Sequence, residues 1–303
     1  MGGVISKIHS LKQCGFKTYQ KLYDTCVLPI LDYSSAVWGY KHFQSSDNVQ
    51  NRAIRYFLGV HRFTPVIALT GETGWLPSMY RRWIIMLKYW NRLVLLDEDR
   101  LTKSAFETDY QHSAYTDNWC SDIKRIMMNL QLTSHFDHQT PVDINTVKER
   151  IETYYSARWS ADCENTPKLR TYRTFKSHRS IKCEDYLMLD LTRNERAVYA
   201  QFRCGVLPLR VETGRYVGEA PDERLCTMCD AQAVEDETHF LTNCAMYQTI
   251  RETVFGDILD TQLYKDLSNA QRLTYLITNF NRKVAKFIVR SFIVRRNALY
   301  RRQ

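Results

Sequence analysis

The amino-acid sequence predicts a mainly α-helical fold with a small metal-binding knuckle. Along most of the chain, apolar residues recur at steps of three and four positions, which is the spacing of one helix face. Capping residues open several of these segments, and glycine or proline closes them. Three cysteines and one histidine within residues 226–244 predict the knuckle. With 303 residues, 44% of them hydrophobic, the chain can bury a substantial core.

The first hundred residues contain four predicted helices. We expect the first to be kinked or divided at Pro29, because proline cannot continue a helix without losing a backbone hydrogen bond. The second begins at the capping residues Ser46 and Asp47 and ends at Gly59. The third starts at Thr64-Pro65, and the sequence "GETGWLP" then predicts a turn. The fourth carries a buried stripe made of Met79, Trp83, Met86, Leu87, Trp90 and Leu93.

Farther along, a polar stretch without periodicity at 133–142 is predicted to be a linker. Its His135 and His138 are residue types that ligate metals. A surface loop is the preferred interpretation, because no further ligands stand nearby in the sequence. Helical spacing resumes at 143–163 and again at 186–204.

These features divide the chain into five predicted parts. They are a helical region at 1–132, a linker at 133–142, a basic helical connector at 143–215, a knuckle unit at 216–266, and a basic amphipathic C-terminal helix at 267–303.

The net charge of +9 is concentrated at the C-terminal end. Residues 267–303 contain nine Lys and Arg and no Asp or Glu, so the preceding residues carry 33 charges of each sign. In the predicted C-terminal helix, Lys283, Lys286 and Arg290 share one face, and apolar residues occupy the other. A second block, 168–182, has six Lys and Arg and no acidic residue. Both segments are candidates for binding phosphate.

Cations interleaved with rings are typical of surfaces that bind single-stranded nucleic acid, because the cations neutralise phosphates and the rings stack on bases. We therefore predict that RNA or DNA contacts both basic segments. The predicted contact residues are Lys168, Arg170, Tyr172, Arg173, Lys176 and Arg179 in the first block, and Arg282, Lys283, Lys286, Arg290, Arg295 and Arg296 in the C-terminal helix.

Two alternatives remain open for these basic segments. Block 168–182 is also consistent with a solvated helix face, and the C-terminal helix with a membrane-surface helix. The latter requires acylation of Gly2 in "MGGVIS", a weak match to the myristoylation pattern. No secretory signal and no apolar run of membrane-spanning length is present. We therefore expect the cytoplasm and nucleus as the location, with no membrane partner.

Cys226, Cys229, His239 and Cys244 spell C-x2-C-x9-H-x4-C, which predicts a zinc site. Two thiols separated by two residues present both sulfurs to one ion. Three thiolates and one imidazole then complete the tetrahedron that zinc prefers. In a chain without an export signal, such thiols indicate metal binding rather than disulfides. The alternative is four unrelated residues in a chain that has nine cysteines.

The zinc ion is predicted to be structural. Four protein ligands leave no open position for a reacting water molecule. Seven acidic residues surround the ligands between positions 219 and 237, against Arg224 alone. Because a phosphate backbone is repelled by such a segment, we expect the knuckle to pin the fold or to contact protein.

No catalytic constellation is visible in the sequence. The motifs G-x-S-x-G and H-E-x-x-H and a glycine-rich phosphate loop are all absent. The acidic clusters at 97–99 and 235–237 are interpreted as a helix end and a helix N-terminus. We therefore expect a protein without enzymatic activity.

Several separated stretches resemble, in order, the C-terminal third of reverse transcriptases from LINE-type (non-LTR) retrotransposons. The stretches are "LPILDYSSAVWGY", "VQNRAIRYFLGV", "TPVIALTGETGWLP", "QFRCGVLPLRVETGRY", "ERLCTMC" with "EDETHFLTNC", and "KVAKFIVRSFIVRR". This resemblance implies a thumb-like helical region that follows the polymerase palm, and then a helical C-terminal region with a zinc knuckle. The family's knuckle ligands correspond to the four residues named above. In the family, such regions are thought to help hold template RNA and target DNA.

The departures from the family define the rest of the prediction. The paired aspartates of the polymerase site and an endonuclease are absent, and no proline follows Pro221 to form the Pro-Asp pair of a restriction-like nuclease. We therefore expect a non-catalytic fragment of a longer polyprotein. Its expected partners are RNA, DNA or both, and the missing polymerase half. The alternative is a zinc-stapled protein-interaction scaffold, repurposed or degenerate, that does not bind nucleic acid.

Overall fold

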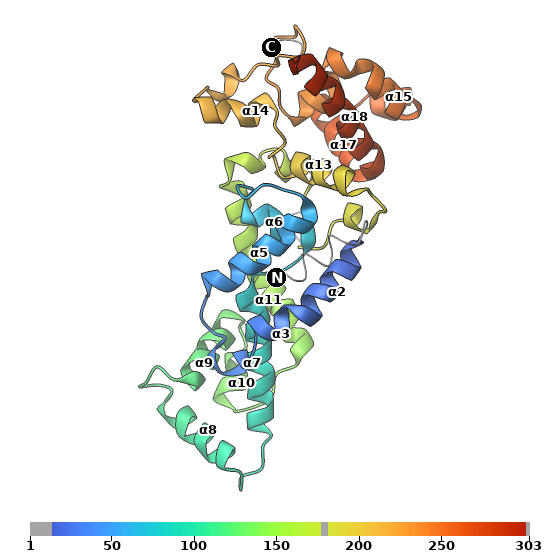
Figure 1. Ribbon diagram of the computed structural model, residues 1–303. Coiled ribbons are helices and arrows are strands. Elements are labelled where there is room, and N and C mark those ends of the chain that lie inside the picture. Colours follow the sequence, from blue (N-terminus) through green and yellow to red (C-terminus); the bar gives the residue numbers. More distant parts are fainter. Residues whose placement is uncertain (1–13, 177–180, 301–303) are drawn as a thin grey trace.

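The computed structural model describes residues 14–176 and 181–300, which form helices joined by short loops (Figure 1). Within these residues, β pairing is limited to one bridge between Leu225 and Val234. The prediction of a mainly α-helical fold is therefore confirmed. The molecule is elongated, with α8 (Leu101–His112) at one end and α15 (Gln248–Leu259) and α18 (Asn281–Tyr300) at the other.

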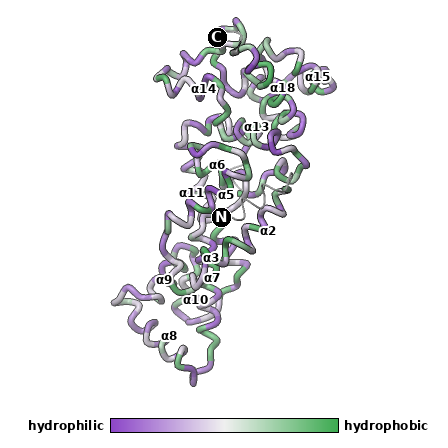
Figure 2. Tube along the Cα trace, in the orientation of Figure 1, coloured by the Kyte–Doolittle hydropathy of each residue, from purple (hydrophilic) through white to green (hydrophobic). Residues whose placement is uncertain are grey.

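Hydrophilic and hydrophobic residues alternate along the trace from one end of the molecule to the other (Figure 2). In the described part of the chain, every helix is too short or too polar to cross a membrane. Gly2, on which the membrane-surface alternative depends, lies outside the described residues.

The predicted division at Pro29 is confirmed. Val27 caps the C-terminus of helix α2 (Phe16–Cys26) and the N-terminus of the short α3 (Leu28–Leu31). Pro29 lies in the first turn of α3. Proline is tolerated there because the first N–H groups of a helix have no intrahelical partner. A further short helix, α4 (Ser35–Trp38), leads into the next element.

Helix α5 (Gln44–Leu58) ends as predicted at Gly59, whose φ of 68° places it in the left-handed region that glycine adopts without strain. Its beginning differs from the prediction, because neither Ser46 nor Asp47 caps it. The carboxylate of Asp47 instead accepts hydrogen bonds from the backbone N–H (3.0 Å) and the hydroxyl (2.6 Å) of Ser78. Asp47 therefore supports the start of α7 (Ser78–Val94), a different helix.

Helix α6 (Val66–Thr73) follows Pro65, as predicted. It extends farther than predicted, so the first three residues of the expected "GETGWLP" turn form its last helical turn. The chain reverses at Gly74, with φ +72°. The extension buries Glu72 completely, and this carboxylate has a specific partner described below.

The first of two hydrophobic cores lies around α7, whose predicted stripe is confirmed except that Met79 is only half-buried. Trp90 is fully buried and stacks on Phe136 with ring centroids 5.4 Å apart. Helices α8, α9, α10 and α11 surround this first core. The bounds of the last three are α9 (Trp119–Asn129), α10 (Thr133–Asp137) and α11 (Ile144–Glu164).

The prediction of a linker at 133–142 is wrong for these residues, because they belong to the first core. They form α10 and the start of the next connection, with Phe136 and Val142 buried. The amide of Asn91 bonds both backbone groups of Val142, at 2.7 and 2.8 Å. His135 and His138 make separate local hydrogen bonds, to Thr140 and to the Ser134 carbonyl. Neither histidine belongs to a cluster of metal-ligating groups in the described residues.

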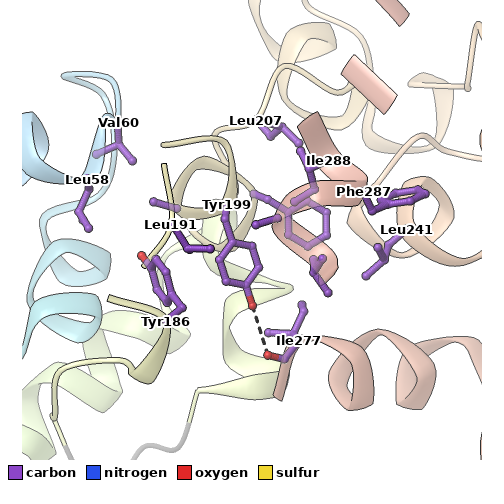
Figure 3. Packing of buried hydrophobic residues seen from close by; sticks show 14 of the residues in the cluster. Leu58, Val60, Tyr186, Leu191, Tyr199, Leu207, Leu241, Ile277, Phe287 and Ile288 are labelled. Atoms are coloured by element: carbon purple, nitrogen blue, oxygen red, sulfur yellow. Dashed lines mark hydrogen bonds between the residues drawn. The ribbon is translucent and has the colours of Figure 1, made fainter. Parts of the chain in front are cut away.

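The second core brings together α2, α5 and the C-terminal half of the chain (Figure 3). Tyr199 of α13 (Arg193–Arg203) lies at its centre, and its hydroxyl donates to the Ile277 carbonyl at 3.2 Å. Phe287 and Ile288, from α18, are fully buried beside it. Ile277 belongs to α17 (Asn269–Asn279), which packs against α18.

Helix α13 begins later than the predicted 186–204 segment. Thr192 caps it reciprocally with Glu195. The residues before it form a 3-10 turn and an extended connection. The other short elements are η1 (Pro167–Leu169), α12 (Tyr172–Phe175), η2 (Asp185–Met188), α14 (Arg210–Thr213), η3 (Gly214–Val217), η4 (Pro221–Glu223), the π-helical turn η5 (His239–Asn243), η6 (Ala245–Tyr247) and α16 (Gln262–Lys265).

A buried ion network joins the two cores. Arg203 of α13 donates to both carboxylate oxygens of Glu72, at 2.7 and 3.0 Å, and also pairs with Glu184. Lys176 binds Glu184 from the other side and the carbonyl of Gly71. The rings of Phe175, Tyr186 and Tyr199 surround the guanidinium of Arg203. The network therefore links α6, α12 and α13 at one point.

Candidate metal centre and basic helix

The four predicted metal ligands converge. Their ligand atoms all lie within 4.8 Å of one another. The sulfurs of Cys226 and Cys244 are 3.9 Å apart, and the Cys229 sulfur is 3.4 Å from Nε2 of His239. A tetrahedral zinc ion, with bonds of about 2.3 Å to sulfur and about 2.0 Å to nitrogen, separates its ligands by about 3.5–3.8 Å. The geometry therefore fits a small zinc site.

Local backbone bonds place these ligands. The bridge between Leu225 and Val234 closes the loop that carries Cys226 and Cys229, and the N–H of Met228 points at the Cys226 sulfur at 3.4 Å. Asp236 accepts a hydrogen bond from the His239 N–H at 2.7 Å, which confirms the predicted acidic residue at a helix N-terminus. The π-helical turn η5 then sets His239 and Cys244 at its two ends.

The pKa values of Cys226 and Cys244 are set by their mutual contact, unlike those of thiols outside the cluster. The hydrogen bond with Cys244 lowers the pKa of Cys226, and the same contact raises the pKa of Cys244, so the pair favours one thiolate. Elsewhere burial alone dominates, and it raises the pKa of Cys163 to about 11 and that of Cys183 to about 12. A divalent cation between the four ligands would favour the thiolate form further.

Glu235 connects the cluster to α18. This carboxylate is fully buried, with one oxygen 3.7 Å from the Cys226 sulfur. Its other oxygen accepts from Arg295 Nη2 at 2.9 Å and from the backbone N–H of Arg210 at 2.8 Å. Arg295 is therefore buried in an ion pair, and the prediction that it contacts nucleic acid is wrong. Its function here is to tie the C-terminal helix to the ligand loop.

Replacing Arg295 with lysine is expected to lower the free energy of unfolding by about 1.5–3 kcal/mol, because one ammonium cannot replace two guanidinium hydrogen bonds to a buried carboxylate. Equilibrium denaturation in urea would measure the loss. Arg296→Lys, at the exposed neighbouring position, is the matched control and is expected to leave stability unchanged. Equal stabilities for both variants would show that the Glu235–Arg295 pair does not stabilise the fold.

The described residues 168–176 of the basic block do not form the predicted open surface. Tyr172 is fully buried, and Lys176 belongs to the ion network between the cores. Arg173 turns inward to the carbonyls of Cys163 and Glu164. Arg179 lies outside the described residues. The prediction that Tyr172 and Lys176 contact bases or phosphates is therefore wrong. Arg173 is bound to the end of α11.

Acidic residues in or just before the knuckle unit pair with two further cations of this block. Arg170 donates to Glu237 at 2.8 Å, and Lys168 pairs with Glu212 just before the unit. Glu237 is almost fully buried, and it also accepts from Thr171 at 2.8 Å. Two segments of opposite charge, distant in sequence, thus neutralise each other. In the described part of the block, Lys182 is the cation that stays exposed without an ion pair.

The C-terminal helix is amphipathic, as predicted. Its buried face carries Val284, Phe287, Ile288 and Ser291. On the opposite side lie four exposed cations, which we call the cation row and which are Arg282, Lys286, Arg290 and Arg296.

Within the described residues, Lys286, Arg290 and Arg296 form no ion pair. Arg282 donates to the Asp190 carbonyl at 3.0 Å. Lys283, also predicted as a contact, is half-exposed and binds Asp257 at 2.6 Å. The cation row is therefore the part of the predicted interface that remains available.

No protein-family model matches this chain, and neither a curated protein nor a solved structure does. Two local features therefore carry the functional inference. They are the Cys/Cys/His/Cys cluster and the cation row on α18. Sequence reasoning missed the carboxylates that hold these parts together, above all Glu235, because their arginine partners are distant in the sequence.

Proposed function

We propose that this chain is a non-catalytic module that binds RNA or DNA through the cation row of α18. One observation carries the proposal: the row is exposed, and three of its four members lack an acidic partner among the described residues. Most other cations singled out in the sequence are used inside the molecule, as the pairs of Arg170, Lys176 and Arg295 illustrate. The row therefore contains the predicted contact residues that stay exposed without an ion pair among the described residues.

The arrangement of the row suits a line of phosphates. Arg282, Lys286 and Arg290 follow one another at intervals of four residues, which places them on one side of the helix at a rise of about 6 Å per step. Each cation that neutralises a phosphate releases counterions, and this release drives binding at low salt. No base-reading geometry is needed for such contacts, so the expected affinity is largely independent of sequence.

Zinc is the proposed occupant of the Cys/Cys/His/Cys cluster, in a structural role. Three soft sulfurs and one imidazole are the donor set that favours zinc. The ion would hold the loop 223–247 closed. Through the contact of Glu235 with Arg295, that loop supports α18. Zinc would then act on nucleic-acid binding only by keeping the helix in place.

The resemblance to LINE-type reverse transcriptases supports the same function. Under this proposal the chain is a fragment of a larger polyprotein, and its helices help hold template RNA or target DNA beside the polymerase. The polymerase half would be its natural protein partner. A thumb-like role for the N-terminal helices agrees with their all-helical architecture.

Charge reversal on the row is the direct test. Lys286→Glu with Arg290→Glu is expected to weaken binding of single-stranded RNA at every sequence. It should also reduce the slope of log K against log salt by about 1.4, because each lost contact on a single strand contributes about 0.7. Fluorescence anisotropy with a labelled oligonucleotide at several salt concentrations gives both quantities.

The chain offers a matched control for this variant. Lys88 and Arg92 also lie four residues apart on the exposed side of a helix, α7, at a distance from α18 (Figure 1). Lys88→Glu with Arg92→Glu makes the same change in net charge. Equal weakening in both variants would mean that net charge alone attracts RNA, and it would remove α18 from the proposal.

A protein-binding scaffold is the second candidate. Tyr216 and Val217, adjacent in η3 just before the knuckle, are 67% and 68% exposed, and contiguous exposed apolar residues are a feature of protein-contact sites. The acidic residues of the knuckle segment give this candidate less support than the sequence suggests, because Glu219, Glu235 and Glu237 form ion pairs within the molecule. Absence of RNA binding by the wild-type chain, even at low salt, would favour the scaffold.

A further inference from the structure

A groove of about 1040 Å³ lies between α13, the start of α14 and α18. Its apolar lining comes from Val198, Pro208, Val289, Phe292, Ile293 and Leu299. Ile293 and Leu299 are 48% and 43% exposed, so the groove is open to solvent. A recess of this size is large enough for a planar ring system with its substituents.

The charges of the groove all have one sign. Its charged lining residues are Arg210, Arg295 and Arg296, and no acidic residue lines it. Arg210 and Arg295 are held by Glu219 and Glu235, whereas Arg296 is exposed at the edge. This lining favours a ligand whose apolar part lies in the recess and whose negatively charged part lies at its edge, beside Arg296.

The groove continues into the cation row. Ile293 follows Arg290 by three residues and precedes Arg296 by three, and helix neighbours at this spacing share one side. Phosphates bound along Lys286, Arg290 and Arg296 would therefore pass directly beside the apolar recess. Bases attached to those phosphates would lie within reach of it.

We propose that this groove receives unpaired bases of a single-stranded nucleic acid whose backbone follows the cation row. The inference rests on the proposed function of α18 and adds a preference for single strands. Apolar side chains shield the flat faces of bases from water, and the adjacent cations neutralise the backbone. In a duplex the bases are paired and stacked inside the helix, so they do not enter the groove.

The proposal is tested by removing the two exposed apolar side chains without changing charge. Ile293→Ser with Leu299→Ser is expected to lower the affinity for a short single-stranded oligonucleotide about tenfold, toward the low end of the range for loss of one aromatic stacking contact with a base. Affinity for a duplex of the same length, and both salt slopes, should stay unchanged. Leu95→Ser with Leu101→Ser, at sites 70% and 87% exposed outside the groove, is the control.

A second measurement uses the wild-type chain alone. A strand that carries the fluorescent base 2-aminopurine reports transfer of that base from stacked neighbours to a protein surface. We expect its fluorescence to change on binding to the wild-type chain, and to change much less with the Ile293→Ser, Leu299→Ser variant. An unchanged signal on saturation with wild type would overturn the placement of bases in the groove.

The outcomes separate this inference from the proposed function. Equal affinity for single strand and duplex, or full single-strand affinity in the groove variant, would overturn the groove proposal. In either case, a loss of binding in Lys286→Glu, Arg290→Glu would leave the proposed function intact. Absence of binding to both forms at low salt would overturn both proposals.

Discussion

Cys229→Ser is expected to abolish tight zinc binding and to unfold the ligand loop. A structural zinc site supplies roughly 10–16 kcal/mol in small zinc-dependent domains, and loss of one ligand should remove on the order of 5 kcal/mol of that stabilisation. Cys229 stands 3.4 Å from His239, so its loss also leaves the imidazole without its neighbour in the cluster. Zinc content by mass spectrometry and thermal unfolding of the zinc-loaded chain would measure the two effects.

The control for this variant is Cys26→Ser. Cys26 is exposed at the end of α2, outside the cluster. Its replacement by serine is the same chemical change as Cys229→Ser. We expect it to retain one zinc ion per chain and the wild-type melting curve. A Cys229→Ser protein that did the same would show that the four residues do not form a metal site.

The unfolding caused by zinc loss is expected to spread along a defined path. Glu235, within the loop 223–247, binds Arg295, and Arg251 donates to the carbonyls of Leu241 and Cys244, each at 2.9 Å. Helices α15 and α18 therefore lose contacts when the loop opens. No residue of the loop belongs to the first core, which the loop approaches through the bonds of Glu237 to Arg170 and Thr171. Under the proposed function, loss of zinc is therefore expected to weaken nucleic-acid binding through α18.

Arg203→Met is expected to destabilise the fold by about 3–5 kcal/mol, because it leaves the fully buried Glu72 without its cation. Lys176 and Glu184 would still pair with each other, but they would not supply the two hydrogen bonds that Arg203 donates to Glu72. The midpoint of urea unfolding measures the effect. The double variant Arg203→Met, Glu72→Met should recover part of the loss, since no carboxylate is then left unpaired.

Arg193→Met controls for the substitution itself. Arg193 begins the same helix, is exposed, and contacts the Tyr56 ring at 5.3 Å. Removing that contact should cost no more than about 1 kcal/mol. If Arg203→Met were as mild as this control, the ion network would not be what joins the two cores.

The features that could be predicted from the sequence are local ones. Pro29 and Gly59 act through their own backbone conformations, so the breaks they cause are visible without knowledge of the fold. The metal ligands lie within one short segment, and their spacing alone specifies a knuckle. The buried stripe of α7 repeats over seventeen residues, long enough for helical periodicity to be unambiguous.

The features that could not be predicted depend on partners far away in the chain. Lys176 and Arg295 look like surface cations in the sequence, and only the packed structure reveals Glu184 and Glu235 against them. Charge runs are usually solvated, so burial of such a block contradicts the ordinary expectation. The stretch 133–142 likewise has too few apolar residues to show periodicity, yet Phe136 and Val142 are enough to anchor it.

These corrections move the predicted interface rather than remove it. Of the twelve predicted contact residues, those in the block 168–176 are engaged with the chain itself, and those on α18 divide by face. Arg282, Lys286, Arg290 and Arg296 are exposed, and their role as phosphate contacts stays a prediction. The central claim of the proposal is therefore that the cation row of α18 provides the phosphate-binding surface.

The most direct test is a titration of the zinc-loaded wild-type chain into labelled single-stranded RNA at several salt concentrations. Three to four phosphate contacts on a single strand predict that log K falls linearly with log salt, with a slope of about −2 to −3. That result would establish a compact, salt-sensitive phosphate-binding surface of the size of the cation row. No binding at the lowest salt, or an affinity that does not change with salt, would contradict the account.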